Sequence, residues 1–198
     1  MKIKISLLPL MLLILLGAPL TPVKAQSYSR CNYEITERRS SSFREVVLER
    51  FGIKVDIPEN YRTMLRQDGS VEILHPDVFK IVQCVARGGI GGSGSYGEIL
   101  SMVNRNSSLS LRQQAIQSAG YMYDNRGRQI PKGSHVMEYK NSHLSGHIIV
   151  SDGGYTYHFL GNVTGQNKLL KVDIGCDCTL DVEAITSLLS RIRSLNTL

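Results

Sequence analysis

Polar and apolar residues alternate along most of this chain, and the alternation predicts a protein built largely from β-strands. Short segments that alternate, or that are rich in β-branched residues, are typical of half-buried or buried strands. They occur at 43–49, 53–57, 70–74, 78–86, 135–139, 147–150, 155–160 and 169–174. Asp152-Gly153-Gly154 separates two of them and predicts a tight hairpin. The closely spaced strands of the second half favour an antiparallel sheet.

Two regions instead repeat apolar residues with helical spacing. Residues 98–118 predict one or two amphipathic helices with a break near 104–108. Residues 180–195 predict a further helix, with Thr179 as its cap and basic residues in its last turn. The order of strands, helices, strands and helix predicts an α+β fold, in which helices cover a mainly antiparallel sheet.

The first 25 residues have the pattern of a secretory signal peptide. Lys2 and Lys4 precede an apolar run over 5–20, and Val23-Lys24-Ala25 offers a small-residue cleavage site. The apolar run is shorter than the roughly 20 residues that span a bilayer, which disfavours a retained anchor. We expect export to the periplasm, the extracellular space or the thylakoid lumen, with no stable transmembrane anchor after cleavage. The expected organisation is a signal peptide at 1–25, a polar N-terminal segment at 26–42 and a single α+β domain at 43–198.

The charge of the chain argues against a nucleic-acid partner. The full chain has 23 Lys and Arg against 17 Asp and Glu, a net charge of +6. Three lysines and no acid lie in the signal segment, so 20 basic and 17 acidic residues remain, a balance of +3. The basic residues are scattered, with Arg38-Arg39 as the only adjacent pair, and form no stripe that could follow a phosphate backbone.

All four cysteines, Cys31, Cys84, Cys176 and Cys178, lie beyond the signal segment. An even number in an exported chain predicts disulfides, and four cysteines allow three pairings. A bridge between Cys176 and Cys178 would close a very small ring, so we expect these two to pair with Cys31 and Cys84. A redox role is a weaker alternative, because C-x-C lacks the C-x-x-C spacing at a helix start.

Several phrases resemble a known family. Phe51 to Pro58, followed by Asn60 and Tyr61, is similar to the opening of the PsbP-like α/β/α family, with Tyr61 where that family usually has Trp. The closing order of strand, hairpin, strand and helix is similar too. The phrases at 57–62, 68–74 and 79–84 also resemble uncharacterised exported proteins of oxygenic phototrophic bacteria. The family resemblance implies a PsbP-like α-β-α sandwich and a non-catalytic binding or assembly role.

The glycine-rich stretch at 87–98 contains G-x-G-x-x-G at 92–97. A dinucleotide site would need an acid about 20 residues further on, but after Glu98 the next acid is Asp124. The stretch also lacks the Gly-Lys-Ser/Thr ending of a phosphate loop. We therefore expect no cofactor here and interpret the stretch as a flexible connection. The alternative is a recognition loop, formed by Gly92, Gly94, Tyr96 and Gly97, with Tyr96 as the contact.

Histidines on the later strands form a candidate metal site. His143 and His147 would share one face of a regular strand, and His158 lies on a neighbouring strand. Neutral imidazoles hold zinc or copper in many proteins. The structural alternative is that each histidine is solvated or hydrogen-bonded within the sheet.

Motifs of common hydrolases are missing from the chain. It has no G-x-S-x-G elbow and no H-E-x-x-H. Ser151 or Cys84 would become a candidate nucleophile only if folding placed a histidine beside it. We therefore expect an exported, non-catalytic binding or assembly module whose partner is a protein or a small ligand. The alternatives are a metal-binding extracytoplasmic protein and a secreted enzyme of unrecognised type.

Overall fold

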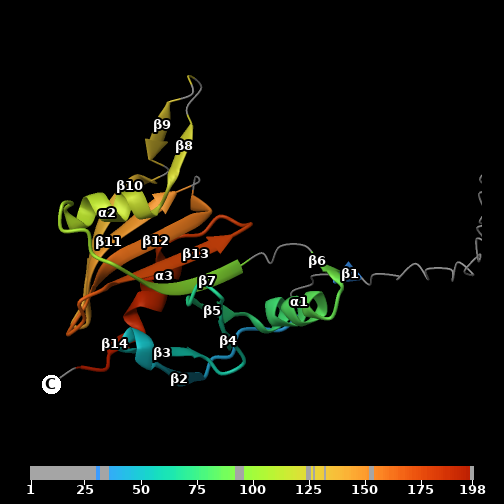
Figure 1. Ribbon diagram of the computed structural model, residues 1–198. Helices are drawn as coiled ribbons and strands as arrows, with labels where there is room; N and C mark the ends of the chain where they lie inside the picture. The colour runs from blue at the N-terminus through green and yellow to red at the C-terminus, as the bar shows by residue number, and fades with distance from the viewer. Residues whose placement is uncertain are drawn as a thin grey trace, which may run out of the picture.

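Figure 1 shows the computed structural model, which describes residues 30–31, 36–91, 96–123, 126, 128–131, 133–151 and 154–196. The signal segment expected at 1–25 lies outside these residues. No helix in the described part of the chain is long and apolar enough to cross a membrane.

A seven-stranded antiparallel sheet forms the centre of the protein. Its order is β10-β11-β12-β13-β7-β5-β4. The bounds are β4 Arg62–Leu65, β5 Val71–Leu74, β7 Tyr96–Val103, β10 Gly133–Lys140, β11 Leu144–Ser151, β12 Thr156–Val163 and β13 Leu169–Cys176. The strands β10 to β13 are neighbours in chain order and form a meander, which confirms the closely spaced strands predicted for the second half. The expected hairpin joins β11 to β12, where Ser151 pairs with Thr156.

A smaller layer packs on one face of this sheet. It contains the three-stranded sheet β14-β3-β2 and the helix α3. Its elements are β2 Phe43–Leu48, the 3-10 helix η1 Glu49–Phe51, β3 Ile53–Pro58, α3 Val182–Ser190 and β14 Ile192–Ser194. Between the two layers lies the larger core, which includes the fully buried side chains Ile53, Ile73, Leu100, Phe159 and Val172.

The helix α2 (Leu111–Ser118) covers the other face of the central sheet (Figure 1). Ala115 and Ala119 pack on Ile149, Leu160 and Leu169 in a second core. Ser110 begins the helix with a capping box in which Gln113 is the reciprocal partner. The protein is therefore an α+β fold in which a mainly antiparallel sheet is covered by helices on both faces.

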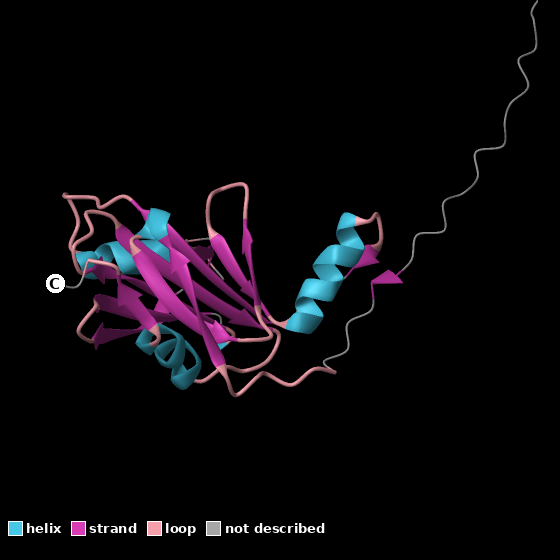
Figure 2. Cartoon of the chain, turned by 90° about the horizontal axis from the view of Figure 1, so that it is seen from below, coloured by secondary structure: helices cyan, strands magenta, loops and turns pink. Residues whose placement is uncertain are grey.

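The helix α1 (Pro76–Ala86) projects from the body of the molecule (Figure 2). It carries two short strands, β1 (Arg30–Cys31) and β6 (Ile90–Gly91), which pair in parallel. Away from this part of the chain, β8 (Tyr121–Tyr123) and β9 (Gln129–Pro131) form a separate hairpin.

Three predicted elements are wrong in type or extent. Residues 78–86 belong to α1 rather than to a strand, because Pro76 and the cap from His75 start a helix whose apolar residues also repeat with helical spacing. Residues 96–103 form β7, since Glu98 and Leu100 alternate into the core, and only the second half of 98–118 is helical. The C-terminal helix ends at Ser190, its cap is Asp181 rather than Thr179, and the chain continues as β14.

Candidate functional site

The structure brings Ser151, His158 and Asp173 together on the α2 side of the central sheet. Ser151 Oγ lies 2.9 Å from His158 Nε2, and His158 Nδ1 lies 2.6 Å from Asp173 Oδ1. Lys171 Nζ holds the second oxygen of Asp173 at 3.0 Å. His158 and Asp173 are direct cross-strand partners, which explains their contact. Sequence reasoning named Ser151 but missed its partners, because the contact depends on strand register.

The order serine, histidine, aspartate is that of a catalytic triad, but burial decides its role here. Ser151 has 0% exposed surface, and its Oγ also approaches the carbonyl oxygen of Thr156 at 3.5 Å. A nucleophile has to reach its substrate. In this conformation the three side chains therefore act as a buried polar network that links β11, β12 and β13.

The proposed metal ligands do not converge on one point. Within the described residues, no group of three His, Cys, Asp or Glu side chains is placed to hold a metal ion. His147 lies on β11, whereas His143 precedes this strand in a bend, so the two do not share one face of a regular strand. Nδ1 of each of these two is buried without a hydrogen-bond partner among the described residues, and His158 is engaged by Ser151 and Asp173.

The cysteines pair as Cys31–Cys84 and Cys176–Cys178. Both disulfides are as expected for an exported chain, but the expected pairing is wrong. Cys31 lies on β1, beside Cys84 of α1, whereas Cys176 ends β13 in the central sheet. The separation of the two elements leaves Cys176 and Cys178 to each other.

Only part of the predicted recognition loop can be placed. Gly92 and Gly94 lie outside the described residues, while Tyr96 and Gly97 begin β7. The start of the stretch has a packing role, because a Cβ on Gly89 would overlap the Sγ atoms of Cys31 and Cys84. This close approach explains why glycine precedes β6 next to the disulfide.

Tyr96 makes a hydrogen bond to a buried carboxyl, and together with Gly97 it also lines a cavity of about 290 Å³. Its hydroxyl donates to Glu98 Oε1 at 2.5 Å, and Glu98 lies in the core-facing row of β7. Burial raises the pKa of Glu98, although the Tyr96 hydrogen bond and the positive charges of Arg191 and Arg39 oppose the shift. Burial likewise lowers the pKa of Arg191. Both guanidinium groups lie over the ring of Phe43, and the distance from Cζ to the ring centre is 5.4 Å for Arg39 and 5.1 Å for Arg191.

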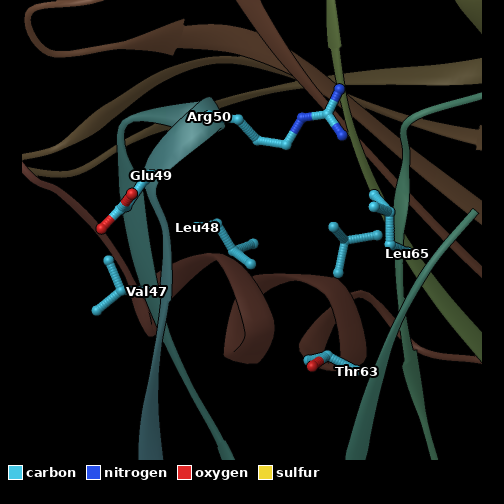
Figure 3. A pocket seen from close by; sticks show the side chains of 7 residues that line it. Val47, Leu48, Glu49, Arg50, Thr63 and Leu65 are labelled. Atoms are coloured by element: carbon cyan, nitrogen blue, oxygen red, sulfur yellow. The ribbon is translucent and has the colours of Figure 1, made fainter.

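The surface offers a more accessible site, which we call the edge groove. It lies between β2–η1 on one side and β4–β5 on the other (Figure 3) and encloses about 520 Å³. Its lining is mostly apolar and consists of Val47, Leu48, Glu49, Arg50, Thr63, Leu65 and Val71. Val47 is 49% exposed and Leu65 63% exposed. Leu48 and Val71 are more deeply placed, so the groove has an apolar floor as well as apolar walls.

Both walls of the edge groove are sheet edges. β2 ends the three-stranded sheet and β4 ends the seven-stranded sheet, so within the described residues each has one paired and one unpaired side. The hydrogen bond from Arg66 N to Ser70 O fixes the β4–β5 register. Because antiparallel pairing alternates, Thr63 and Leu65 then direct their N–H and C=O groups to the unpaired side. On β2, the hydrogen bond from Glu59 N to Ser42 O fixes the register in the same way, so Val47 directs its N–H and C=O groups to the unpaired side.

A hydrogen bond bounds the edge groove at one end, and its lining contains one basic and one acidic side chain, Arg50 and Glu49. Arg44 Nη2 donates to the carbonyl oxygen of Tyr61 at 3.0 Å, which ties β2 to the start of β4. Arg50 extends from η1 toward β4 across the opening (Figure 3). Arg62 donates to the carbonyl oxygens of Glu59 and Tyr61. Arg50 forms no ion pair with another described residue, and Glu49 is the acid of the lining.

Comparison with known proteins adds no family or activity. The chain matches no protein-family model, and no curated protein shows significant similarity to its sequence.

Proposed function

We propose that this protein is an exported, non-catalytic binding module that captures an extended polypeptide segment in the edge groove. The observation that carries the proposal is the pair of unpaired sheet edges flanking an apolar floor. An exposed edge with apolar side chains is a template for strand addition. Main-chain hydrogen bonds from the Thr63 and Leu65 positions would give affinity, and the apolar lining would select side chains.

The charge of the groove mouth suggests the chemistry of the partner. β4 has four residues, about 13 Å of strand, so a segment of similar length would pair with it. Arg50, which lies in the lining, favours an acidic residue next to the apolar ones in that segment. The preferred partner is therefore an extended peptide that alternates apolar residues with polar ones and has acidic flanks.

The setting of the module is part of the same proposal. The two disulfides indicate an oxidising environment, and the signal-like segment supports the periplasm, the extracellular space or the thylakoid lumen. The antiparallel sheet between α2 and the layer that contains α3 supports a PsbP-like α-β-α build. The resemblance of residues 51–61 to that family supports a binding or assembly role.

A peptide-display library screened against the exported protein tests the proposal. Selected peptides should be apolar with acidic flanks and should bind in extended form. Leu65→Lys should weaken their binding 5- to 30-fold, because a leucine more than half exposed has about 1–2 kcal/mol of burial left to gain. Thr63→Pro, which removes an outward-directed N–H, should weaken binding about 2- to 10-fold.

Val182→Lys is the matched control, because it replaces an aliphatic side chain that is 40% exposed on α3 and does not line the groove. It should leave the affinity unchanged. Peptides whose affinity is equal for wild type, Leu65→Lys and Thr63→Pro would show that the edge groove is not the binding site.

A further inference from the structure

We propose that the Cys176–Cys178 disulfide is a thiol–disulfide exchange site that oxidises an external dithiol. In the reaction, a thiolate of the dithiol attacks Cys178 Sγ, the Cys176–Cys178 bond breaks, and Cys176 leaves as a thiolate. The second thiol of the dithiol then attacks the mixed disulfide. The dithiol leaves as a disulfide, and Cys176 and Cys178 remain as two thiols after proton uptake.

The two disulfides differ in their surroundings. Cys31 is buried at 7% exposure, Cys84 is half-buried, and their bridge packs against Gly89 and Gly91. By contrast, Cys178 and the intervening Asp177 are exposed, and Cys176 is half-buried. Thiol–disulfide exchange requires access to a sulfur atom. Only the Cys176–Cys178 pair presents an exposed residue to an incoming thiol.

The local geometry favours one direction of attack. The backbone N–H of Cys178 donates to Cys176 Sγ at 3.2 Å. A hydrogen bond to the leaving sulfur stabilises it as a thiolate, and a better leaving group speeds exchange. The exposed sulfur is thus the one attacked, and the half-buried sulfur with a backbone donor is the one released.

The fold does not depend on this bridge for its connections. The bridge spans a sequence separation of 2, against 53 for Cys31–Cys84, so it restricts the unfolded chain much less. The end of β13 is also held by its pairing with β7, where Cys176 lies opposite Tyr96, and by the hydrogen bond from Cys176 N to Tyr155 O. The reduced form can therefore keep the native sheet, as a site that cycles between two redox states requires.

The experiment follows both disulfides in the same wild-type protein. The exported protein is equilibrated in buffers of reduced and oxidised dithiothreitol, quenched with acid, alkylated with N-ethylmaleimide and digested with trypsin. Cys176 and Cys178 fall in one tryptic peptide, residues 172–191, separate from those of Cys31 and Cys84. We expect half-reduction of Cys176–Cys178 at a reductant ratio at least tenfold lower than for Cys31–Cys84, with unchanged far-ultraviolet circular dichroism. Equal ratios, or earlier reduction of Cys31–Cys84, would overturn the proposal.

A monothiol identifies the attacked sulfur. Brief treatment with glutathione should place the adduct on Cys178, and an adduct on Cys176 instead would contradict the assigned direction. Cys176→Ala/Cys178→Ala provides the matched control, because it keeps the other disulfide. Wild type should oxidise one equivalent of dithiothreitol at mild reductant ratios and the control none. Equal oxidation by both proteins would show that the exchange takes place elsewhere.

Discussion

Removing each disulfide separately should reveal a large difference in their contribution to stability. In the loop-closure model, a bridge of sequence separation 53 stabilises by about 4 kcal/mol and one of separation 2 by about 1 kcal/mol. The loop closed by Cys31–Cys84 contains β2, β3, β4 and β5, so it restricts the parts of both sheets that meet at the edge groove. We therefore expect Cys31→Ala/Cys84→Ala to lose about 4 kcal/mol of unfolding free energy and Cys176→Ala/Cys178→Ala about 1 kcal/mol.

Equilibrium unfolding in urea measures the difference. The chain has nine tyrosines and no tryptophan, so far-ultraviolet circular dichroism is the better probe. With a urea dependence of about 2 kcal/mol/M, the midpoint should fall by about 2 M for the first variant and about 0.5 M for the second. The two unchanged cysteines must remain bridged, which alkylation under non-reducing conditions checks. Equal losses, or a greater loss in Cys176→Ala/Cys178→Ala, would refute the reasoning from loop length.

Three further predictions concern buried polar groups. Burial raises the pKa of Glu98, so its ionisation destabilises the folded state as the pH rises above about 4.3, the pKa in the unfolded chain. Glu98→Gln can still accept a hydrogen bond from Tyr96. It should raise the melting temperature at pH 7, and at pH 4 its melting temperature should equal that of wild type. A variant less stable than wild type at pH 7 would contradict this. Asp77 accepts hydrogen bonds from the backbone N–H groups of Thr36 and Glu37, which hold this segment against α1. Trypsin should therefore cleave after Arg38 and Arg39 several-fold faster in Asp77→Ala than in wild type. Equal cleavage rates would show that Asp77 does not hold the segment in place. A fluorophosphonate probe should not label Ser151, and labelling that His158→Ala abolishes would instead identify a catalytic serine.

The sequence was sufficient for those parts of the fold that local patterns determine. The meander β10–β13 and the strands β2, β3 and β5 each alternate or concentrate β-branched residues over their own length, and short turns separate them. The sequence also predicted α2, in the second half of the helical region at 98–118, and α3, in the helical region at 180–195. In each case the residues that identify the element lie within it or at its ends.

The failures involve residues whose role depends on distant partners. Residues 78–86 are rich in valine and isoleucine, so composition favoured a strand, whereas the cap from His75 and the tether between Asp77 and residues 36–37 favour a helix there. Glu98 is acidic and was expected at a helix start, yet it occupies a core position because Tyr96 satisfies its carboxyl group. In α1 a local start signal and a tertiary contact act together against the strand propensity, whereas at Glu98 a contact within the fold overrides the local expectation.

The candidate sites show the same limit. His158 meets Ser151 and Asp173 only through the register of three strands, and the edge groove is formed by β2 and β4, which belong to different sheets. The disulfide pairing depends on how far α1 lies from the end of β13. Sequence reasoning supplied the residue types at each place, but the contacts between them come from the topology.

Burial divides the chemically capable groups of this protein into two sets. Ser151 and Glu98 are buried, whereas the side chains of His158 and Asp173 are 12% and 24% exposed. All four make hydrogen bonds within the protein, which suits them to hold the sheet together. Among the groups that meet solvent are the backbone edges beside exposed Val47 and Leu65, and the disulfide Cys176–Cys178. An edge can pair with another chain, and an exposed disulfide can exchange with a thiol, but neither supplies the general base and nucleophile of a hydrolase. The edge and the disulfide are the groups on which the two proposals, strand addition and thiol exchange, depend.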